Sequence, residues 1–428
     1  MVIKKLCTSL VCAAVVISAS GCSKGGDSAS EPGKSSASQQ PVTLKILQHG
    51  ATISQDEVKM LLTDPVQKKY PHITLEFFTA PTGYGLEQMV AAGDLPDMIY
   101  SADVQLPFFH KLDVPYDLTE LVKKYNVDLG KFDQQAIETI KIRSNLGNVL
   151  AALPFSLNTG VLYYNKNIFD RFGVPYPKDG MTWEDAVELG KKIGRVENNV
   201  TYYGLDNLEI SQMSLPVIDY KTNKATFTAD GFKRFFTMWK AVKEIPPGNK
   251  EVGKARDNFM KNNTLAMLAD WFSIVTRAIE NKELNWDIAS YPVFAERPGI
   301  GLRTESHMLV ITSASQHKEE AFQAITAILS DENQVRAARM GRLSSLNDPK
   351  YKQLFGADVP GLAGKNIKGA LSIKSASILP SNKYTDIAGA EIGNIMSAIL
   401  QGKDVNTALR EAEERANQKI ATELAANK

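Results

Sequence analysis

Residues 153–166, with the sequence LPFSLNTGVLYYNK, constrain the fold more than any other part of the chain. The second half of this stretch, residues 160–164, is rich in β-branched and aromatic side chains and is predicted to form a buried strand. Three polar residues, Ser156, Asn158 and Thr159, come directly before that strand. We therefore expect a crossing between two domains, where a strand starts at a cleft and side chains from both walls reach a ligand.

The length of the chain and the order of its predicted elements agree with two domains. The chain has 428 residues, more than one typical hydrophobic core accommodates. Apolar alternation predicts strands at residues 42–47 and 73–78, and apolar residues at helical spacing predict a helix at 55–70 between them. A third strand is predicted at residues 95–101. This strand, helix, strand order predicts an α/β fold.

The rest of the chain carries further helix and strand patterns. Helices are predicted at residues 86–92, 118–125, 135–142, 167–172, 232–243, 318–329, 387–400 and 406–424, and strands at 264–268, 286–293 and 307–311. Thr182 and Asp185 predict a capping box at the start of another helix. Trp183 and Trp239 are predicted to pack in the core. The glycine-rich residues 297–305 are predicted to form a loop.

Polar and aromatic residues gather where the predicted strands begin or end. In open α/β sheets, ligands collect beyond the carboxyl ends of the strands. Trp271 follows the predicted strand 264–268 in a polar neighbourhood and is predicted to stack on a ligand ring; a tryptophan tucked under a loop is the alternative. Asp103 is a candidate too, although a helix cap or a solvated loop acid explains it equally well. The candidate ligand-binding residues are His49, Ser101, Asp103, Ser156, Asn158, Asp270, Trp271, Glu305 and Ser306.

The amino terminus has the pattern of an export signal. Two lysines precede a short apolar run, which is too short to span a bilayer. The sequence Ala-Ser-Gly-Cys22 follows and resembles the bacterial lipobox, in which the cysteine is diacylated, although Ala19 stands where leucine is usual. We expect residues 1–21 to be a lipoprotein signal peptide and Cys22 to be the lipidation site. A plain secretory signal with an incidental cysteine is the alternative.

Cysteine usage and net charge limit the disulfides and the partners that the mature chain can have. Cys7 and Cys12 fall inside the predicted signal, so only Cys22 remains after processing and no intrachain disulfide is possible. Residues 22–41 lack large apolar side chains and are predicted to be a flexible tether with a reach of about 25 Å. The net charge of +1 falls to −1 once the two lysines of the signal are removed, which does not predict a nucleic-acid partner.

The sequence contains no residue pattern typical of an enzyme. The motifs G-x-S-x-G, H-E-x-x-H, G-x-x-x-x-G-K-[ST] and a complete G-x-G-x-x-G are absent. The five histidines are scattered without ligand spacing, so neither a metal site nor a cofactor is expected. Carboxylates such as those of Glu305 and Asp270 could still meet in space. A glycoside hydrolase therefore stays open as an alternative.

Several segments in a fixed order resemble family 1 extracellular solute-binding proteins, the receptors of ABC importers. These segments are residues 64–77, 89–100, 153–166, 182–185, 265–271 and 308–329, preceded by Cys22 and the tether. Each motif alone is weak, but their order is specific, and the resemblance covers essentially the whole mature chain. It implies a two-lobed fold like that of periplasmic binding proteins, in which each lobe is a sheet flanked by helices and crossing hinge strands join the lobes.

The resemblance also implies domain boundaries and roles for single residues. The implied domains are lobe 1, residues 42–156 and 306–342, and lobe 2, residues 157–305 and 343–428. The resemblance implies that Asn158 bonds a sugar hydroxyl and that Trp271 stacks on a sugar face. It also implies that Ser101 is the ligand-binding residue at the end of its strand. Glu305-Ser306-His307 stands where many sugar-binding members have Gly-Gly. That departure leaves room for a uronate, an oligosaccharide with a charged group or another polar solute.

The function that the resemblance implies is that of a lipid-anchored receptor on the extracellular face of the cell membrane. It would bind a carbohydrate between its lobes, close by a hinge motion and deliver the solute to the membrane subunits of an ABC transporter. We expect a monomer that is not an enzyme and that meets the membrane through its lipid anchor only. A ligand sensor for a membrane kinase is the alternative to transport.

Overall fold

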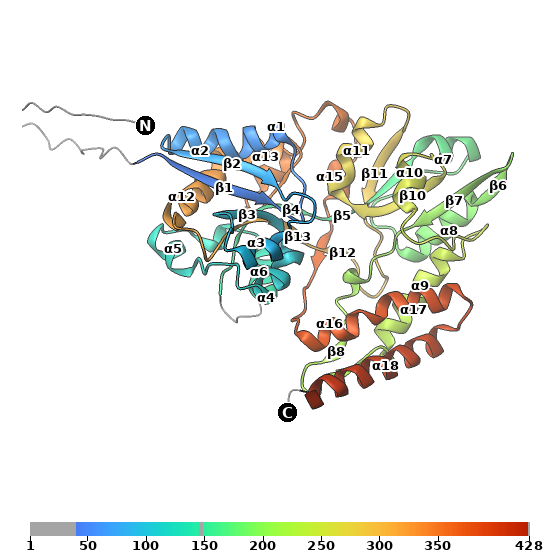
Figure 1. Cartoon of the computed structure of the whole chain (residues 1–428). Helices are drawn as coiled ribbons and strands as arrows, with labels where there is room; N and C mark the ends of the chain where they lie inside the picture. Colours follow the sequence, from blue (N-terminus) through green and yellow to red (C-terminus); the bar gives the residue numbers. More distant parts are fainter. Residues whose placement is uncertain (1–39, 145–148, 427–428) are drawn as a thin grey trace, which may run out of the picture. The chain divides into compact units, whose positions relative to one another are not determined.

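The computed structural model describes residues 40–144 and 149–426. Every described helix and strand lies in one compact unit, Pro41–Lys428 (Figure 1). The predicted signal peptide, Cys22 and nearly all of the predicted tether lie outside the described residues.

Among the described residues, a six-stranded sheet is built from the first part of the chain and two later returns. Its strand order is β14-β4-β13-β3-β1-β2. The strands are β1 (Val42–Gln48), β2 (Ile73–Thr79), β3 (Met98–Ala102), β4 (Leu153–Asn158), β13 (Glu305–Ile311) and β14 (Leu343–Ser344). Strand β1 runs parallel to β2 and β3, whereas β13 runs antiparallel to β3 and β4. The carboxyl end of β3 and the amino end of β13 therefore meet at one edge of the sheet.

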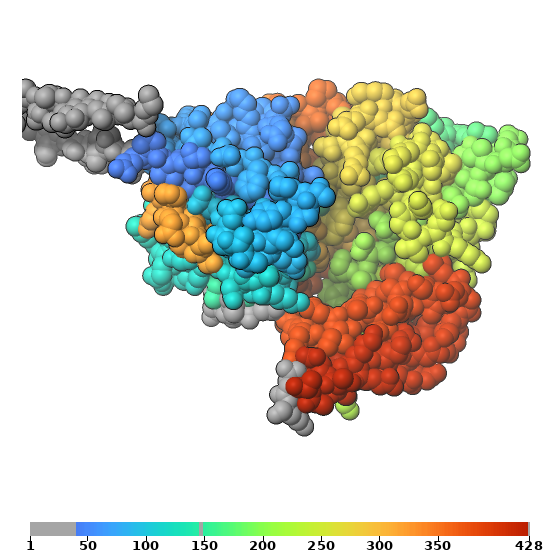
Figure 2. Space-filling model, viewed as in Figure 1, coloured from blue at the N-terminus to red at the C-terminus, as the bar shows by residue number. Residues whose placement is uncertain are grey.

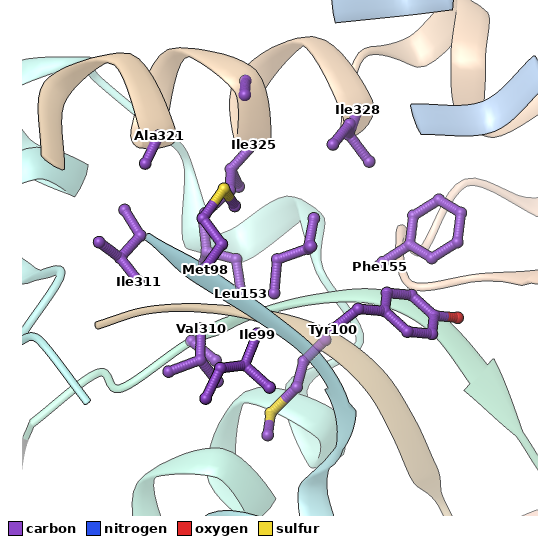
Figure 3. Packing of buried hydrophobic residues seen from close by; sticks show 14 of the residues in the cluster. Met98, Ile99, Tyr100, Leu153, Phe155, Val310, Ile311, Ala321, Ile325 and Ile328 are labelled. Carbon is purple, nitrogen blue, oxygen red and sulfur yellow. The ribbon is translucent and has the colours of Figure 1, made fainter. Parts of the chain in front are cut away.

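Helices flank this sheet and enclose its apolar core. They are α1 (Gln55–Glu57), η1 (Val58–Thr63), α2 (Asp64–Lys69), α3 (Leu86–Ala92), η2 (Asp103–Gln105), α4 (Leu106–Lys111), α5 (Thr119–Lys124), η3 (Leu129–Lys131), α6 (Gln134–Arg143), α12 (Lys318–Ile328) and α13 (Asp331–Arg339). Figure 3 shows Ala321, Ile325 and Ile328 of α12 facing Met98 and other buried side chains of the strands. The predicted helix at 55–70 is confirmed, with the π-helical segment η1 at its centre.

A second sheet, five-stranded within the described residues, has the order β11-β5-β10-β7-β6. Its strands are β5 (Gly160–Asn165), β6 (Arg195–Glu197), β7 (Val200–Asp206), β10 (Leu265–Trp271) and β11 (Trp286–Ser290). Its helices are α7 (Lys166–Phe172), α8 (Trp183–Ile193), η4 (Ile210–Met213), α9 (Asp230–Lys243), α10 (Ala255–Met260), η5 (Phe272–Ile274) and α11 (Val275–Glu280). Trp183 and Trp239 are 0% and 4% exposed, which confirms that both pack in the core.

The carboxyl-terminal segment adds helices to the core of the second sheet. Its elements are α14 (Pro349–Gln353), η6 (Pro360–Leu362), α15 (Ile367–Ala370), β15 (Lys374–Ala376), α16 (Lys383–Gly389), α17 (Glu391–Leu400) and α18 (Val405–Ala426). Helix α18 also contacts the hairpin of β8 (Ile218–Asp219) and β9 (Lys224–Ala225). In Figure 2, residues 383–426 form a continuous red surface. Ile395, Ile399 and Leu409 from this segment join Phe236 of α9 in one apolar cluster.

Two segments differ from the prediction. Residues 297–305 are not a simple loop, because they contain β12 (Ile300–Arg303), which pairs with β15, and the first residue of β13. Gly301 permits this pairing, since a Cβ atom there would lie 2.7 Å from Cγ2 of Ile373. Trp271 is the last residue of β10 and not a residue beyond it, because β10 pairs with β5 as far as Trp271 and Gly160.

The chain passes between the two sheets inside residues 153–166. Strand β4 belongs to the six-stranded sheet and β5 to the five-stranded sheet, with Thr159 alone between them. A second passage runs from β12, which contacts β5, to β13, with Thr304 alone between them. The loop at Arg342 leads into β14, which pairs with β4. The predicted boundaries of the two lobes stay a prediction.

A buried carboxylate under α18 makes a testable contribution to stability. Glu391 is 0% exposed and accepts hydrogen bonds from Arg415 Nε at 2.9 Å, Lys419 Nζ at 2.6 Å and Asn394 Nδ2 at 3.0 Å. Burial alone would raise the pKa of Glu391, but these donors outweigh it and lower the pKa to about 2. Because the pKa is depressed in the folded state, the contribution is complete above the ordinary carboxyl pKa of about 4.3 and is lost as the pH falls towards 2.

We expect Glu391→Gln to lower the free energy of unfolding at pH 7 and to approach the wild-type value near pH 2.5, as measured by urea unfolding. Glu414→Gln is the matched control, since the Glu414 ion pair with Arg410 is 57% exposed on both sides and should contribute little at any pH. A difference for Glu391→Gln that stays constant from pH 7 to pH 2.5 would contradict this account.

Candidate functional site

Residues from both sheets meet where the chain crosses between them. Glu305 at the start of β13 pairs with Asn158 at the end of β4, and Trp271 at the end of β10 pairs with Gly160 at the start of β5. Since Asn158 and Gly160 are two residues apart, the pairing brings Trp271 and Glu305 to the same crossing. We call the residues gathered here the crossing site: Asp103, Arg143, Asn158, Glu209, Trp271, Arg303 and Glu305.

Asn158 holds the segment that follows Trp271. Its Nδ2 donates to Ser273 Oγ at 3.0 Å, and its Oδ1 accepts from the Ser273 backbone N–H at 3.0 Å. Asn158 is 6% exposed. Both ends of its amide are therefore engaged, and the contact positions the turn beside the indole.

Asp103 joins four segments of the chain. It is fully buried in the turn after β3, and its Oδ2 accepts from the backbone N–H and the hydroxyl of Ser306 at 2.6 and 3.2 Å. Arg143 Nε and Arg303 Nη1 lie 3.2 and 3.4 Å from its Oδ1. The structure thus brings the two candidates Asp103 and Ser306 into direct contact, with two guanidinium groups beside them.

Arg303 connects Asp103 with the indole. Its guanidinium carbon lies 5.6 Å from the centre of the Trp271 ring, within the range of a cation–π contact. Its Nη2 lies 3.7 Å from Glu305 Oε2. Arg303 was not among the predicted residues. A strand prediction for residues 300–303 would have placed it at a strand end, next to Glu305.

Asp270 orients Trp271 from the other side. It is fully buried and accepts from Arg256 Nε at 2.6 Å and Nη2 at 2.8 Å, a bidentate arrangement. Its Oδ1 also accepts from the Trp271 backbone N–H at 2.8 Å. Asp270 therefore fixes the end of β10, with its carboxylate already occupied by Arg256.

Two carboxylates of the crossing site have no hydrogen-bond donor from the described part of the chain. Glu305 meets Arg303 only at 3.7 Å, and the carboxylate of Glu209, in the segment between β7 and η4, has no hydrogen bond. Burial raises the pKa of Glu305, and the Asp103 carboxylate adds to the rise although Arg303 opposes it. Burial raises the pKa of Glu209 as well, and the Asp270 carboxylate adds to it.

Arg143, at the end of α6, forms an ion pair with Asp103, but its Nε has no aligned hydrogen-bond acceptor within the described residues. Its side chain is 18% exposed, and its Nε is enclosed. Burial lowers the pKa of Arg143, and the neighbouring charge of Arg303 lowers it further. Among the described residues, the crossing site thus combines the guanidinium groups of Arg143 and Arg303, two carboxylates that accept no hydrogen bond, and one indole. Sequence patterns missed Arg143 and Glu209 because neither follows a predicted strand directly.

The remaining candidates lie near the same edge of the six-stranded sheet. The His49 backbone N–H donates to the Tyr100 carbonyl at 3.0 Å, and its ring stacks on Phe108 with centroids 5.9 Å apart and an interplanar angle of 18°. Burial lowers the pKa of His49. Ser101 and Ser156 are 0% and 2% exposed, so both hydroxyls are covered within the sheet.

A second ionic group lies beside β13. Arg342 Nε and Nη2 donate to the two carboxylate oxygens of Glu57 at 2.7 and 2.9 Å, and Nη2 also lies 3.3 Å from the Thr52 carbonyl. Arg342 Nη1 and the Tyr100 hydroxyl both approach Nδ1 of His307, at 3.1 and 2.9 Å. This group ties the loop after β1 to the passage into β14.

Two features are absent from residues 40–144 and 149–426, a metal-binding cluster and a membrane-spanning helix. Within those ranges no cluster of three or more histidine, cysteine or acidic side chains is arranged to hold a metal ion. None of the helices described there combines the length and the apolar character that crossing a membrane requires.

Comparison with solved structures identifies the architecture. An ABC substrate-binding protein from Listeria monocytogenes in complex with cycloalternan has a TM-score of 0.70 and 18% identity, covering 89% of this chain and 100% of that chain. A sugar transporter from Rhizobium etli in an open conformation gives 0.67 and 22%, with 88% and 99% covered. The sugar-binding protein MalE from Xanthomonas citri gives 0.67 and 19%, with 90% and 99% covered. These similarities confirm the predicted two-lobed α/β fold.

The family follows from a direct match. Residues 52–335 match the model of the family described as bacterial extracellular solute-binding protein. This range spans well over half of the chain and includes the crossing site. The chain belongs to the bacterial extracellular solute-binding protein family.

Proposed function

We propose that the protein is a receptor that binds a carbohydrate at the crossing site and delivers it, unaltered, to an ABC transporter. One observation carries this proposal: a partly buried indole shares one site with two guanidinium groups and with two carboxylates that accept no hydrogen bond within the described part of the chain. Trp271 supplies the indole, the guanidinium groups of Arg143 and Arg303 the donors, and Glu209 and Glu305 the acceptors.

Sugar hydroxyls fit this arrangement because each hydroxyl both donates and accepts a hydrogen bond. A hydroxyl can donate to Glu305 or Glu209 and accept from Arg143, which a purely anionic or purely cationic group cannot do. The apolar face of a pyranose ring can cover the indole of Trp271. Solved relatives of the same fold carry cycloalternan and mannotriose, which agrees with an oligosaccharide as the solute.

The proposed mechanism is a shift between two populations of the molecule. A carbohydrate that touches residues from both sheets binds a closed form better than an open form, and that difference in affinity drives closure. The crossings at Thr159 and Thr304 are single residues between strands of different sheets, so they are the places where a hinge can bend. The closed form is then recognised by the membrane subunits of the transporter.

The experiment that tests the function is a thermal-shift screen of the compact unit Pro41–Lys428 against mono- and oligosaccharides. A ligand at 100 times its Kd stabilises the native state by about 2.7 kcal/mol, which appears as a rise in Tm. We expect a rise with oligosaccharides. A screen in which peptides or metal ions alone raise Tm would remove carbohydrates as the solute.

We also propose that the receptor is held on the extracellular face of the cell membrane by a lipid on Cys22. The lipobox-like sequence and the tether support this proposal. Cells that express the full chain should incorporate labelled palmitate into it and keep it in the membrane fraction, and Cys22→Ser should abolish both. Unchanged labelling of Cys22→Ser would contradict the anchor, while the binding function would stand.

A lipid-anchored glycoside hydrolase is the second candidate, because burial raises the pKa of both Glu209 and Glu305, and the Glu209 carboxylate adds to the rise in the pKa of Glu305. A protonated and an ionised carboxyl group on either side of a glycosidic bond are the usual requirement of such enzymes. A reducing-end assay with each oligosaccharide that binds separates the two functions. A receptor gives saturable binding and no new reducing ends, whereas a hydrolase gives turnover.

A further inference from the structure

We propose that His307 is a further ligand-binding residue, held by Arg342 in the tautomer whose Nε2–H donates to an acceptor oxygen of the bound carbohydrate. His307 lies in β13, two residues after Glu305, and is 8% exposed. The inference rests on the proposed function, because it adds a contact to the same site. It assigns to the ligand a hydrogen-bond donor, which an ionised carboxylate such as that of Glu305 cannot supply.

The tautomer follows from what surrounds Nδ1. Arg342 Nη1 lies 3.1 Å from His307 Nδ1, and a guanidinium group has donors only, so Nδ1 must be the acceptor. A neutral imidazole that accepts at Nδ1 carries its proton on Nε2. The Tyr100 hydroxyl lies 2.9 Å from the same nitrogen. It can donate a second hydrogen bond to Nδ1 or lie beside the guanidinium without donating, and both arrangements agree with Nδ1 as the acceptor.

The charge of the ring is fixed by the same neighbours. Burial lowers the pKa of His307 to about 3, and the adjacent Arg342 charge contributes, while the Glu57 carboxylate opposes it weakly. Tyr100, the other ionisable group against the ring, has its pKa raised to about 12 by burial. Opposite His307 on β4 lies Ser156, which carries no charge. The imidazole is therefore neutral across the physiological range and acts as a permanent donor.

The other nitrogen of the ring is free to meet a ligand. Within the described residues no hydrogen bond reaches His307 Nε2, so this nitrogen is left for a partner from outside the described chain. Residues two apart on a strand point to the same face and are separated by about 7 Å. Glu305 and His307 thus present an acceptor and a donor side by side along β13.

The first test determines the tautomer of the His307 ring in the unaltered protein. Nitrogen–proton correlation spectra of ¹⁵N-histidine-labelled protein should show His307 as the Nε2–H tautomer, unchanged between pH 5 and pH 8. Histidine to glutamine substitution at 307 or 317 assigns the signals; the half-buried His317, directly before α12, is the matched control. Saturating mannotriose or cycloalternan should then shift the His307 Nε2–H signal and leave His317 unchanged. A ring protonated on Nδ1, a ring that titrates near pH 6.5, or a signal that the bound sugar does not move would overturn the assignment.

The second test measures affinity for the same two sugars by calorimetry. His307→Phe should weaken binding by about tenfold, the usual loss for one neutral hydrogen bond. His307→Gln keeps a side-chain N–H and an acceptor for Arg342, so it should stay within about threefold of wild type. Equal affinity of His307→Phe and wild type would overturn the role of His307 alone. Wild-type protein that binds no carbohydrate at all, in the thermal-shift screen or here, would overturn the proposed function and this assignment with it.

Discussion

Trp271→Ala is expected to weaken carbohydrate binding by tenfold or more while changing Tm by less than about 2 °C. Tenfold corresponds to about 1.4 kcal/mol, which is within reach of one aromatic platform against a sugar ring. The indole is only partly buried, at the edge of the core of the second sheet, so its removal leaves that core closed. The measurement is a calorimetric titration with any oligosaccharide that raises Tm.

Trp239→Ala is the matched control for this prediction. Trp239 is 4% exposed in α9, inside the apolar core of the second sheet, and its truncation opens a cavity. Large-to-small changes of this kind cost about 3–5 kcal/mol of stability. The control should therefore lower Tm and leave the affinity of the folded protein unchanged. Unchanged affinity in Trp271→Ala would remove Trp271 from the binding site.

Glu57→Gln is expected to lower the free energy of unfolding by about 2 kcal/mol at pH 7. The substitution breaks the bidentate pair with Arg342 and leaves a guanidinium without its counter-charge. Fully buried pairs lose about 3–5 kcal/mol when one partner is removed; here the side chains are 17% and 20% exposed, so solvent compensates part of the loss. The substitution also weakens the capping box at Ser54, whose backbone N–H donates to Glu57 at 2.9 Å.

The pH dependence of this effect has a definite sign. Burial raises the pKa of Glu57, but Arg342 and Ser54 together outweigh it and hold the pKa below its usual range. The stabilisation is thus complete above about pH 4.3 and disappears as the pH falls through the lower folded-state value. Glu332→Gln is the control, since its pair with Lys68 is 64–68% exposed and should contribute little. Equal destabilisation by Glu57→Gln and Glu332→Gln would contradict a larger contribution of the Glu57–Arg342 pair to stability.

Much of the fold could be predicted because local patterns report local structure. The capping box at Thr182 is confirmed, with its hydroxyl accepting from the Asp185 backbone N–H at 3.1 Å. Strand β12 was missed because its glycine indicates a loop locally, whereas that glycine allows close packing against Ile373, a residue much later in the chain. The error therefore came from tertiary contact, which a window of sequence does not contain.

The candidate site could be predicted as a neighbourhood but not as a set of contacts. Strand ends indicated Asp103, Ser306 and Trp271, since sheet topology collects such ends at one edge. Arg303 reaches Asp103 across 200 residues of sequence, and no local pattern reports such a pair. Burial also changes how a residue is interpreted: Asp270 was predicted to bind the ligand, and whether it does so stays a prediction, but its carboxylate is occupied by Arg256.

The central claim is that a carbohydrate bound at the crossing site draws two lobes together and is left chemically unaltered. Small-angle X-ray scattering of Pro41–Lys428, with and without an oligosaccharide that raises its Tm, tests this most directly. We expect a smaller radius of gyration in the bound state, and the same oligosaccharide recovered whole afterwards. Identical scattering curves in the two states, or a shortened sugar in the recovered sample, would contradict it.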